Sequence, residues 1–304
     1  MRAAAGALCL ALALGACAPR LAGPADLHLL HSAELGSDAA EEVHELILGY
    51  EGDTVRAILR RPADTERAAG ALPGIVLLAG RETGREAAAV IPGPLEAVVL
   101  AVEYPEVIPV VAELREIVPH LPAIRRSAYR VPGLLRSAAR FLAAMPEVDA
   151  RRIGLVGVSF GVPFAAAAAT DTVFCCVALH HGGAGLGELF RSNLPLDNRV
   201  LRWVASAWAG LYFARLEPAR HVGRISPRPL LLINGTRDRL VPPGAALRLA
   251  RAAREPVRHI WLPHDHPMPD DFPLMRELAD STLSHFPQLR ERRRAGPADT
   301  TLAP

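Results

Sequence analysis

The sequence contains no lysine. All 34 basic residues are arginine, and together with 32 acidic residues they give a chain of 304 residues a formal net charge of +2. Mechanisms that depend on a lysine amine, such as a Schiff base or a serine–lysine pair, are therefore excluded. The balance of charge also argues against a protein that binds nucleic acid through an overall positive charge, and we expect no nucleic-acid partner.

Cysteine is scarce as well. Of the four cysteines, Cys9 and Cys17 lie close to the N-terminus, and Cys175 and Cys176 are neighbours in an apolar segment. Adjacent residues on a strand point to opposite faces of the sheet, so this pair is poorly placed for an ordinary disulfide. We predict that both are core residues. No group of cysteines and histidines has the spacing of a zinc site, and we expect neither a metal nor a cofactor.

The N-terminus has the pattern of an export signal. Arg2 precedes the apolar run Ala3–Leu14, which is shorter than the roughly 20 residues that a membrane span needs. Leu14-Gly15-Ala16-Cys17 resembles the lipobox of bacterial lipoproteins. That resemblance implies a signal peptide at 1–16, a lipid on Cys17, and attachment to the bacterial cell envelope, at the outer membrane in a Gram-negative cell. The alternative is an ordinary secretory signal.

The remaining chain is predicted to form one α/β domain at 43–294. A tether at 17–42 precedes it and a disordered tail at 295–304 follows. Within the domain, short β-rich runs alternate with helical stretches, which is typical of a mostly parallel sheet flanked by helices. The predicted strands are Val43–Tyr50, Thr54–Arg60, Gly74–Ala79, Ala97–Val102, Ile153–Val158, Phe174–Leu179, Pro229–Ile233 and Val257–Leu262. The predicted helices are Ser127–Ala144, Val162–Ala169, Gly244–Arg254 and Asp271–Phe286.

A candidate nucleophile lies between one of these strands and the helix that follows it. Gly157-Val158-Ser159-Phe160-Gly161 has the G-x-S-x-G pattern of a sharp strand-to-helix turn, which presents the serine Oγ above the sheet. Small flanking residues allow the backbone to turn tightly, and the helix N-terminus directs N–H groups toward developing negative charge. The pattern therefore indicates nucleophilic catalysis by Ser159.

The segment Asp149–Gly161 resembles the nucleophile turns of the α/β-hydrolase superfamily, in particular its dienelactone-hydrolase-like and acyl-esterase-like branches. The resemblance extends over about residues 43 to 290, with Val162 departing from a glycine that many members carry at that position. It implies the α/β-hydrolase fold and the chain order nucleophile, acid, histidine.

The segment Ile233–Pro242 supplies the acid that this order requires. In the superfamily, a buried strand followed by Gly-x-x-Asp, an apolar residue and proline commonly marks the triad aspartate, which corresponds to Asp238. His264 and His266 compete for the role of the base. We prefer His266, because its Pro-x-x-His setting resembles the superfamily's loop after the final strand. A metal site at His264-x-His266 lacks further ligands at a useful spacing.

An oxyanion hole needs two donors. The backbone N–H of Phe160 is one candidate, and the loop after Gly74–Ala79 would supply the other, for which we choose the N–H of Arg81. His180-His181-Gly182-Gly183 superficially resembles a lipase oxyanion motif, but it follows the nucleophile and therefore lies on the wrong strand. It is expected to line the site or simply to turn the chain.

Residues 185–224 exceed the short crossover of a minimal hydrolase. The stretch contains Trp203 and Trp208, and one hypothesis is a small helical cap that covers an acyl-binding pocket. The alternative is a crossover helix that packs on the sheet.

Together these patterns predict a serine hydrolase, most simply a carboxylic-ester hydrolase that acts on a small-molecule acyl substrate. The alternatives are an acyltransferase or a serine peptidase of the same fold, or a non-catalytic lipoprotein scaffold. An intact set of Ser159, Asp238 and His266 argues against the scaffold. The sequence does not specify the acyl chain length, the leaving group or the oligomeric state.

Overall fold

The computed structural model describes residues 20–37, 40–63, 72–91, 96–107 and 117–289. The predicted signal peptide at 1–16, the lipidation site Cys17 and the tail at 295–304 lie outside these residues.

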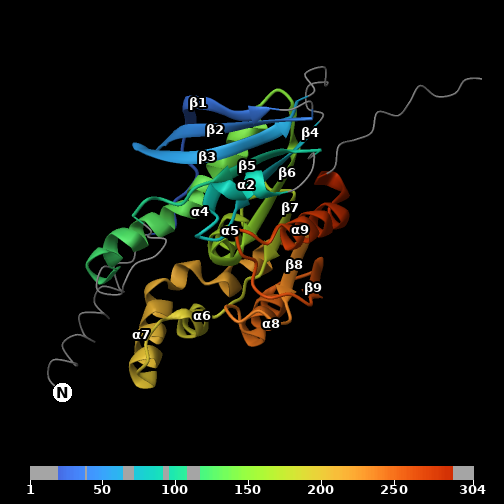
Figure 1. Ribbon diagram of the computed structural model, residues 1–304. Helices are drawn as coiled ribbons and strands as arrows, with labels where there is room; N and C mark the ends of the chain where they lie inside the picture. The colour runs from blue at the N-terminus through green and yellow to red at the C-terminus, as the bar shows by residue number, and fades with distance from the viewer. Residues whose placement is uncertain (1–19, 38–39, 64–71, 92–95, 108–116, 290–304) are drawn as a thin grey trace, which may run out of the picture.

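The described chain is organised around one nine-stranded sheet with the order β1-β2-β3-β5-β4-β6-β7-β8-β9 (Figure 1). The first three strands and β5 pair in antiparallel fashion, and all pairs from β5 to β9 are parallel. The strands are β1 Leu27–Ser37, β2 Glu41–Tyr50, β3 Asp53–Pro62, β4 Leu72–Leu78, β5 Val98–Val102, β6 Val148–Val158, β7 Cys176–His180, β8 Leu230–Gly235 and β9 Val257–Leu262. All eight predicted strands are present.

Four of the central strands are buried along their whole length, because helices cover both faces of a parallel sheet. Every residue of β4, β5, β7 and β8 is buried, and β6 is buried over its C-terminal half. This explains why their sequences are continuous apolar runs rather than alternating ones. Parallel strands also bring their carboxyl ends to one edge of the sheet, where loops can supply a site.

The helices form two layers, one on each face of the sheet (Figure 1). One layer contains α4, α5 and α8, whose apolar residues share a core with one face of the strands; the other contains α2 and α9, which share a second core with the opposite face. The helices are α2 Ala87–Val90, α4 Leu121–Ala143, α5 Val162–Ala168, α6 Leu186–Asn193, α7 Arg199–Tyr212, α8 Pro243–Ala252 and α9 Phe272–His285.

The predicted tether at 17–42 is wrong for most of its length. Leu27–Ser37 forms β1, an edge strand antiparallel to β2. The pairing runs from Leu27 opposite Tyr50 to Ser37 opposite Glu42. Nine of the eleven β1 residues are exposed, so the strand buries no continuous apolar face that a sequence pattern could reveal. The strand is held mainly by the hydrogen bonds of its ladder with β2, and Leu27 is the β1 side chain that packs against the core.

The insertion at 185–224 is helical, as predicted, and consists mainly of α6 and α7. It packs on the layer that contains α4: the Tyr129 hydroxyl donates to the Tyr212 carbonyl, and the Arg125 guanidinium lies 4.0 Å from the centre of the Tyr212 ring. Glu217 accepts hydrogen bonds from the backbone N–H groups of Gly185 and Leu186, which fixes the start of α6.

Cys176 is buried and Cys175 is half-buried, and both are free thiols. Their Sγ atoms lie 3.6 Å apart, well beyond the roughly 2.05 Å of a disulfide bond. The prediction that both are core residues is confirmed for Cys176, whereas Cys175 is half-buried and packs against the same core.

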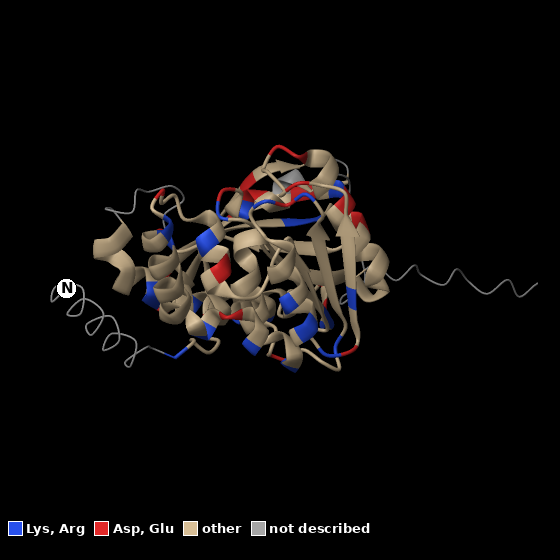
Figure 2. Cartoon of the chain, turned by 90° about the horizontal axis from the view of Figure 1, so that it is seen from below, with Lys and Arg blue, Asp and Glu red and all other residues tan. Residues whose placement is uncertain are grey.

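Acidic and basic residues are interspersed over the elements of the described chain (Figure 2). Among the helices that the structure describes, none combines the length and the apolar character needed to cross a membrane.

Candidate active site

Ser159 lies at the carboxyl end of β6, where the chain makes one 3₁₀ turn over Ser159–Gly161 before α5 begins. Its φ of +54° is in the left-handed region, which a residue with a Cβ rarely adopts. The flanking glycines allow this turn to close against its neighbours. A Cβ at Gly157 would lie 2.5 Å from the Cβ of Ala165, and a Cβ at Gly161 would collide with the Leu78 carbonyl oxygen.

Three of the residues predicted from the sequence form a chain of hydrogen bonds. Ser159 Oγ lies 2.6 Å from His266 Nε2, and His266 Nδ1 lies 2.8 Å from Asp238 Oδ2. An ionised carboxylate only accepts, so His266 donates its Nδ1–H to Asp238 and offers Nε2 to the serine hydroxyl. This is the tautomer that a general base for Ser159 requires.

Asp238 follows β8 and is almost completely enclosed, with a side chain that is 1% exposed. Its Oδ1 accepts from the backbone N–H groups of Leu240 and Val241, each at 2.9 Å. Burial by itself raises the pKa of the carboxyl group, but hydrogen bonds from His181 and His266 outweigh it and hold the pKa well below its usual value. Asp238 is therefore ionised whenever the protein is folded near neutral pH.

His181 belongs to the His180–Gly183 segment, which was expected to line the site or to turn the chain, but its contact with Asp238 was not predicted. It follows β7, has a φ of +49°, and its Nδ1 lies 2.9 Å from Asp238 Oδ2, the same oxygen that His266 contacts. Its side chain is fully buried, and its Nε2 has no hydrogen-bond partner among the described residues. The only sequence signal was its position after the strand that follows the nucleophile strand, the adjacent parallel strand in the sheet.

His264, the alternative base, makes its contact with Glu277 and not with Ser159. Its Nε2 lies 2.8 Å from Oε2 of Glu277, a partly exposed residue in the middle of α9. The structure thus brings His266, and not His264, to the nucleophile. The role of His266 as the base stays a prediction.

The predicted oxyanion donors lie next to the nucleophile. Phe160 is the residue after Ser159, and a Cβ on Gly80 would lie 3.7 Å from the Ser159 Cβ, so the loop that continues to Arg81 borders the same space. Tyr104 ties these parts together, because its hydroxyl donates to the Ala79 carbonyl at 2.6 Å and its ring contacts Phe160 at 5.4 Å. The role of the Arg81 N–H stays a prediction.

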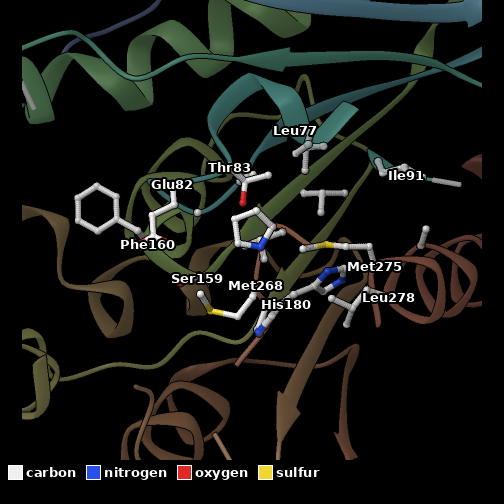
Figure 3. A pocket seen from close by; sticks show the side chains of 18 of the residues that line it. Leu77, Glu82, Thr83, Ile91, Ser159, Phe160, His180, Met268, Met275 and Leu278 are labelled. Atoms are coloured by element: carbon white, nitrogen blue, oxygen red, sulfur yellow. The ribbon is translucent and has the colours of Figure 1, made fainter. Parts of the chain in front are cut away.

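A cavity of about 260 Å³ opens beside Ser159 and His266. Its wall is mostly apolar and comes from the strands, the β4–α2 loop, and α9 with its preceding loop. In Figure 3, Phe160 lies on one side of Ser159, and Leu77, Met275 and Leu278 lie on the other. No described residue of 185–224 lines this cavity, so the helical insertion does not cover it. The hypothesis that the insertion covers the acyl pocket is corrected accordingly.

His181, Asp238 and His266 are also the group of described side chains whose potential metal-ligand atoms come closest together, within 4.8 Å of one another. Both imidazole Nδ1 atoms, however, lie at hydrogen-bond distance from a single carboxylate oxygen. Asp238 Oδ2 thus accepts two hydrogen bonds from imidazoles, and the remaining nitrogen of His266, Nε2, is engaged by Ser159 Oγ. The arrangement therefore fits proton transfer better than metal binding.

Residues 135–262, which include Ser159 and Asp238, match the prolyl oligopeptidase family. The solved structure of an acetyl xylan esterase from Paenibacillus sp. R4 resembles the chain with a TM-score of 0.66 at 16% identity, over 90% of this chain and 92% of that one. This is the α/β-hydrolase fold. A second resemblance, to acetyl xylan esterase 1 from Thermoanaerobacterium sp. JW/SL YS485, has a TM-score of 0.56 at 16% identity and covers 88% and 98% of the two chains.

A peptidase also shares this α/β-hydrolase fold. The puromycin-hydrolyzing peptidase of Mycobacterium tuberculosis resembles the chain with a TM-score of 0.55 at 17% identity, over 85% of this chain and 48% of that one. The uncharacterized protein YfhR of Salmonella typhimurium is 27% identical over 122 residues. That alignment covers 40% of this chain and 42% of YfhR, so the chain matches about two fifths of that relative's length.

The shared carboxylate predicts a pH-dependent stability loss in His181→Ala. Losing a hydrogen bond to a buried charge lowers the free energy of unfolding by about 1.5–3 kcal/mol near pH 7. The pKa of Asp238 is lower in the folded than in the unfolded protein. Its contribution to the free energy of unfolding is therefore fully present above the unfolded pKa of about 3.9, and it is lost as the pH falls through the folded pKa. Urea unfolding followed from pH 7 down to about pH 2 will show a smaller acid-induced loss of unfolding free energy in the variant than in the wild-type protein, with most of the difference below about pH 3.

His181→Asn is the matched control, because its side-chain amide retains a donor near the position of Nδ1. It is expected to recover most of the stability and the pH dependence. An equal, pH-independent loss in both variants would show that His181 contributes only through packing.

Proposed function

We propose that this protein is a serine hydrolase that cleaves carboxylic esters through Ser159, His266 and Asp238. The observation that carries the proposal is the 2.6 Å contact between Ser159 Oγ and His266 Nε2, continued by the 2.8 Å contact from His266 Nδ1 to a buried, ionised Asp238. The match to the prolyl oligopeptidase family and the esterase structures that share the fold support a serine hydrolase.

The first half of the reaction forms an acyl-enzyme. Ser159 Oγ attacks the ester carbonyl carbon while His266 Nε2 takes the hydroxyl proton, and the carbonyl electron pair moves onto oxygen. The N–H of Phe160, with the predicted second donor from Arg81, would hold that oxyanion. Asp238 stabilises the imidazolium that forms. When the intermediate collapses, the C–O bond to the alcohol breaks and His266 returns the proton to the leaving oxygen.

The second half uses the same groups on water. His266 Nε2 takes a proton from a water molecule, the water oxygen attacks the acyl carbon, and collapse of the second intermediate releases the acid and restores the Ser159 hydroxyl. Asp238 keeps the Nδ1 proton of His266 in place throughout, so the imidazole alternates between base and acid without changing tautomer. The step needs no group beyond the side chains and water.

A serine peptidase is the second candidate. The match of residues 135–262 to the prolyl oligopeptidase family favours it, as does the likeness to a puromycin-hydrolyzing peptidase. An amide differs from an ester in its leaving group, which must be protonated as the C–N bond breaks. The same Ser159–His266 pair could perform that step, so the leaving group must be decided by assay.

The proposed nucleophile predicts active-site labelling. A fluorophosphonate probe should label the wild-type protein on Ser159 and leave Ser159→Ala unlabelled, and p-nitrophenyl acetate hydrolysis should fall by at least about 10³-fold in that variant. Intact-mass spectrometry and steady-state kinetics measure the two effects. Ser206→Ala is a suitable control, because Ser206 lies on α7 away from the cavity.

Folded wild-type protein without either labelling or ester hydrolysis would contradict the proposal. Cleavage of aminoacyl-p-nitroanilides with a higher kcat/KM than the matching esters would favour the peptidase instead.

We also propose that the chain is a lipoprotein held at the cell envelope through Cys17. The support is the sequence Leu14-Gly15-Ala16-Cys17 after an apolar run. In a bacterial host, an alkyne-labelled fatty acid should be incorporated into the wild-type chain and into Cys9→Ser, and not into Cys17→Ser. The Cys17→Ser chain should also move from the membrane pellet to the soluble fraction, because one thioether-linked diacylglyceryl group supplies the anchor. Labelling that persists in Cys17→Ser would contradict the assignment.

A further inference from the structure

We propose that the cavity beside Ser159 binds the acyl chain of the substrate, and that this chain is an aliphatic one of medium length. The inference rests on the proposed esterase function and adds the substrate class. It follows from the position, the volume and the chemistry of the cavity.

The cavity continues from the nucleophile into the layer between the sheet and α9. Ser159 and His266 line its opening. Farther in, Leu77 and Ile75 of β4 form part of the wall, together with Val99 of β5. Alternate residues of a strand face the same side, so Ala79, Leu77 and Ile75 form one continuous row beneath the site. At about 3.3 Å per residue, this row extends roughly 13 Å away from the nucleophile turn.

The volume is too large for an acetyl group. An apolar cavity of about 150 Å³ holds benzene, with six carbon atoms. By simple proportion, the 260 Å³ here, which includes the opening beside Ser159, accommodates at most roughly ten carbons. A substrate with an acetyl group would leave most of this apolar surface without a partner, whereas a chain of about eight to ten carbons would fill it.

The wall carries no charge along the buried part of the cavity. His180 and Thr282 are its buried polar side chains, and they satisfy one another: Thr282 Oγ1 donates to the Leu278 carbonyl and lies 3.0 Å from His180 Nε2. Burial lowers the pKa of His180 to about 3, so the imidazole is neutral at physiological pH. The charged lining residues, Arg81 and Glu82, are on the loop at the site's edge.

The opening itself is also apolar. Phe160, Leu240 and Met268 line the cavity and are each at least two-fifths exposed. Large apolar side chains exposed together at a cavity entrance indicate that an apolar ligand covers them. An aliphatic chain that enters past them would bury their surface as well as its own.

The position of the proposed base separates the acyl side from the leaving-group side. His266 returns the proton to the leaving oxygen, so the leaving group must lie toward β8 and β9, the strands whose loops carry Asp238 and His266. On the other side of β6, Ile75 and Leu77 of β4 and Val99 of β5 line the cavity, and α9 covers it. An inner cavity there can retain the acyl group of the acyl-enzyme while the alcohol departs through the opening.

Two ester series test this assignment on the wild-type protein. p-Nitrophenyl esters from acetate to dodecanoate vary the acyl chain, and n-alkyl acetates from ethyl to decyl vary the alcohol, all below their aggregation concentrations. We expect kcat/KM to rise by up to about fourfold per added methylene in the acyl series, which corresponds to roughly 0.8 kcal/mol each, and to level off near eight to ten carbons. The alcohol series should change little.

A variant that fills the cavity provides the second arm. Ala279 on α9 lines the cavity, whereas Ser281 on the same helix lines a separate hollow on its outer side. Ala279→Phe should lower the ratio of decanoate to acetate kcat/KM by at least tenfold, and Ser281→Phe should leave that ratio unchanged. Both substitutions are on a surface helix, and circular dichroism checks that each variant is folded.

A series of inhibitors tests the acyl-chain assignment on the wild-type protein, without either variant. n-Alkylboronic acids bond reversibly to a serine Oγ, with the alkyl group in the acyl position. Their inhibition constants on the wild-type protein should fall from ethyl to octyl in parallel with the acyl-ester profile.

Hydrolysis of p-nitrophenyl acetate with no gain from longer acyl chains would overturn the inference while leaving the proposed esterase intact. A gain confined to the alkyl acetates would assign the cavity to the alcohol and overturn it too. Absence of hydrolysis of every ester, together with absent labelling of Ser159, would overturn the proposed function itself.

Discussion

Two imidazoles and two backbone N–H groups converge on one buried carboxylate, and the rest of the site depends on that arrangement. Asp238 Oδ2 accepts from His181 and His266, and Oδ1 accepts from the turn at Leu240 and Val241. Burial alone would favour the neutral acid. The four donors reverse that preference, so the charge that orients His266 is maintained inside the protein, and His266 presents the nitrogen that Ser159 needs.

The parallel sheet makes this convergence possible. Ser159, His181, Asp238 and His266 follow β6, β7, β8 and β9, four neighbouring strands whose carboxyl ends lie at one edge. Residues separated by more than a hundred positions in the sequence therefore meet within hydrogen-bond distance. The same sheet shapes the cavity, because the face that supports α9 offers the alternate residues of β4 to β7 as a wall. Nucleophile and cavity are thus consequences of one architecture.

Much of the fold could be predicted because buried parallel strands have continuous apolar sequences. β4 and β5 were predicted from such continuous apolar runs. β1 did not, because an exposed edge strand is held by its backbone ladder and leaves no apolar pattern. The helical insertion was recognised from its length, but the direction in which it packs depends on contacts such as Tyr129 with Tyr212, which no local pattern contains.

The sequence alone predicted the turn at Ser159 and the position of Asp238, because each lies in a short motif whose backbone geometry is local, and the resemblance to the α/β-hydrolase superfamily supplied the order of the site residues. The sequence also narrowed the base to two histidines. Only the tertiary structure decided between them: His264 turns outward to Glu277, and His266 reaches Ser159. The structure likewise added His181 to the aspartate and put the cavity under α9, away from the insertion. The positions of His266, His181 and the cavity depend on strand order and on the packing of the helix layers. Both bring distant residues together, and neither is encoded in any one segment.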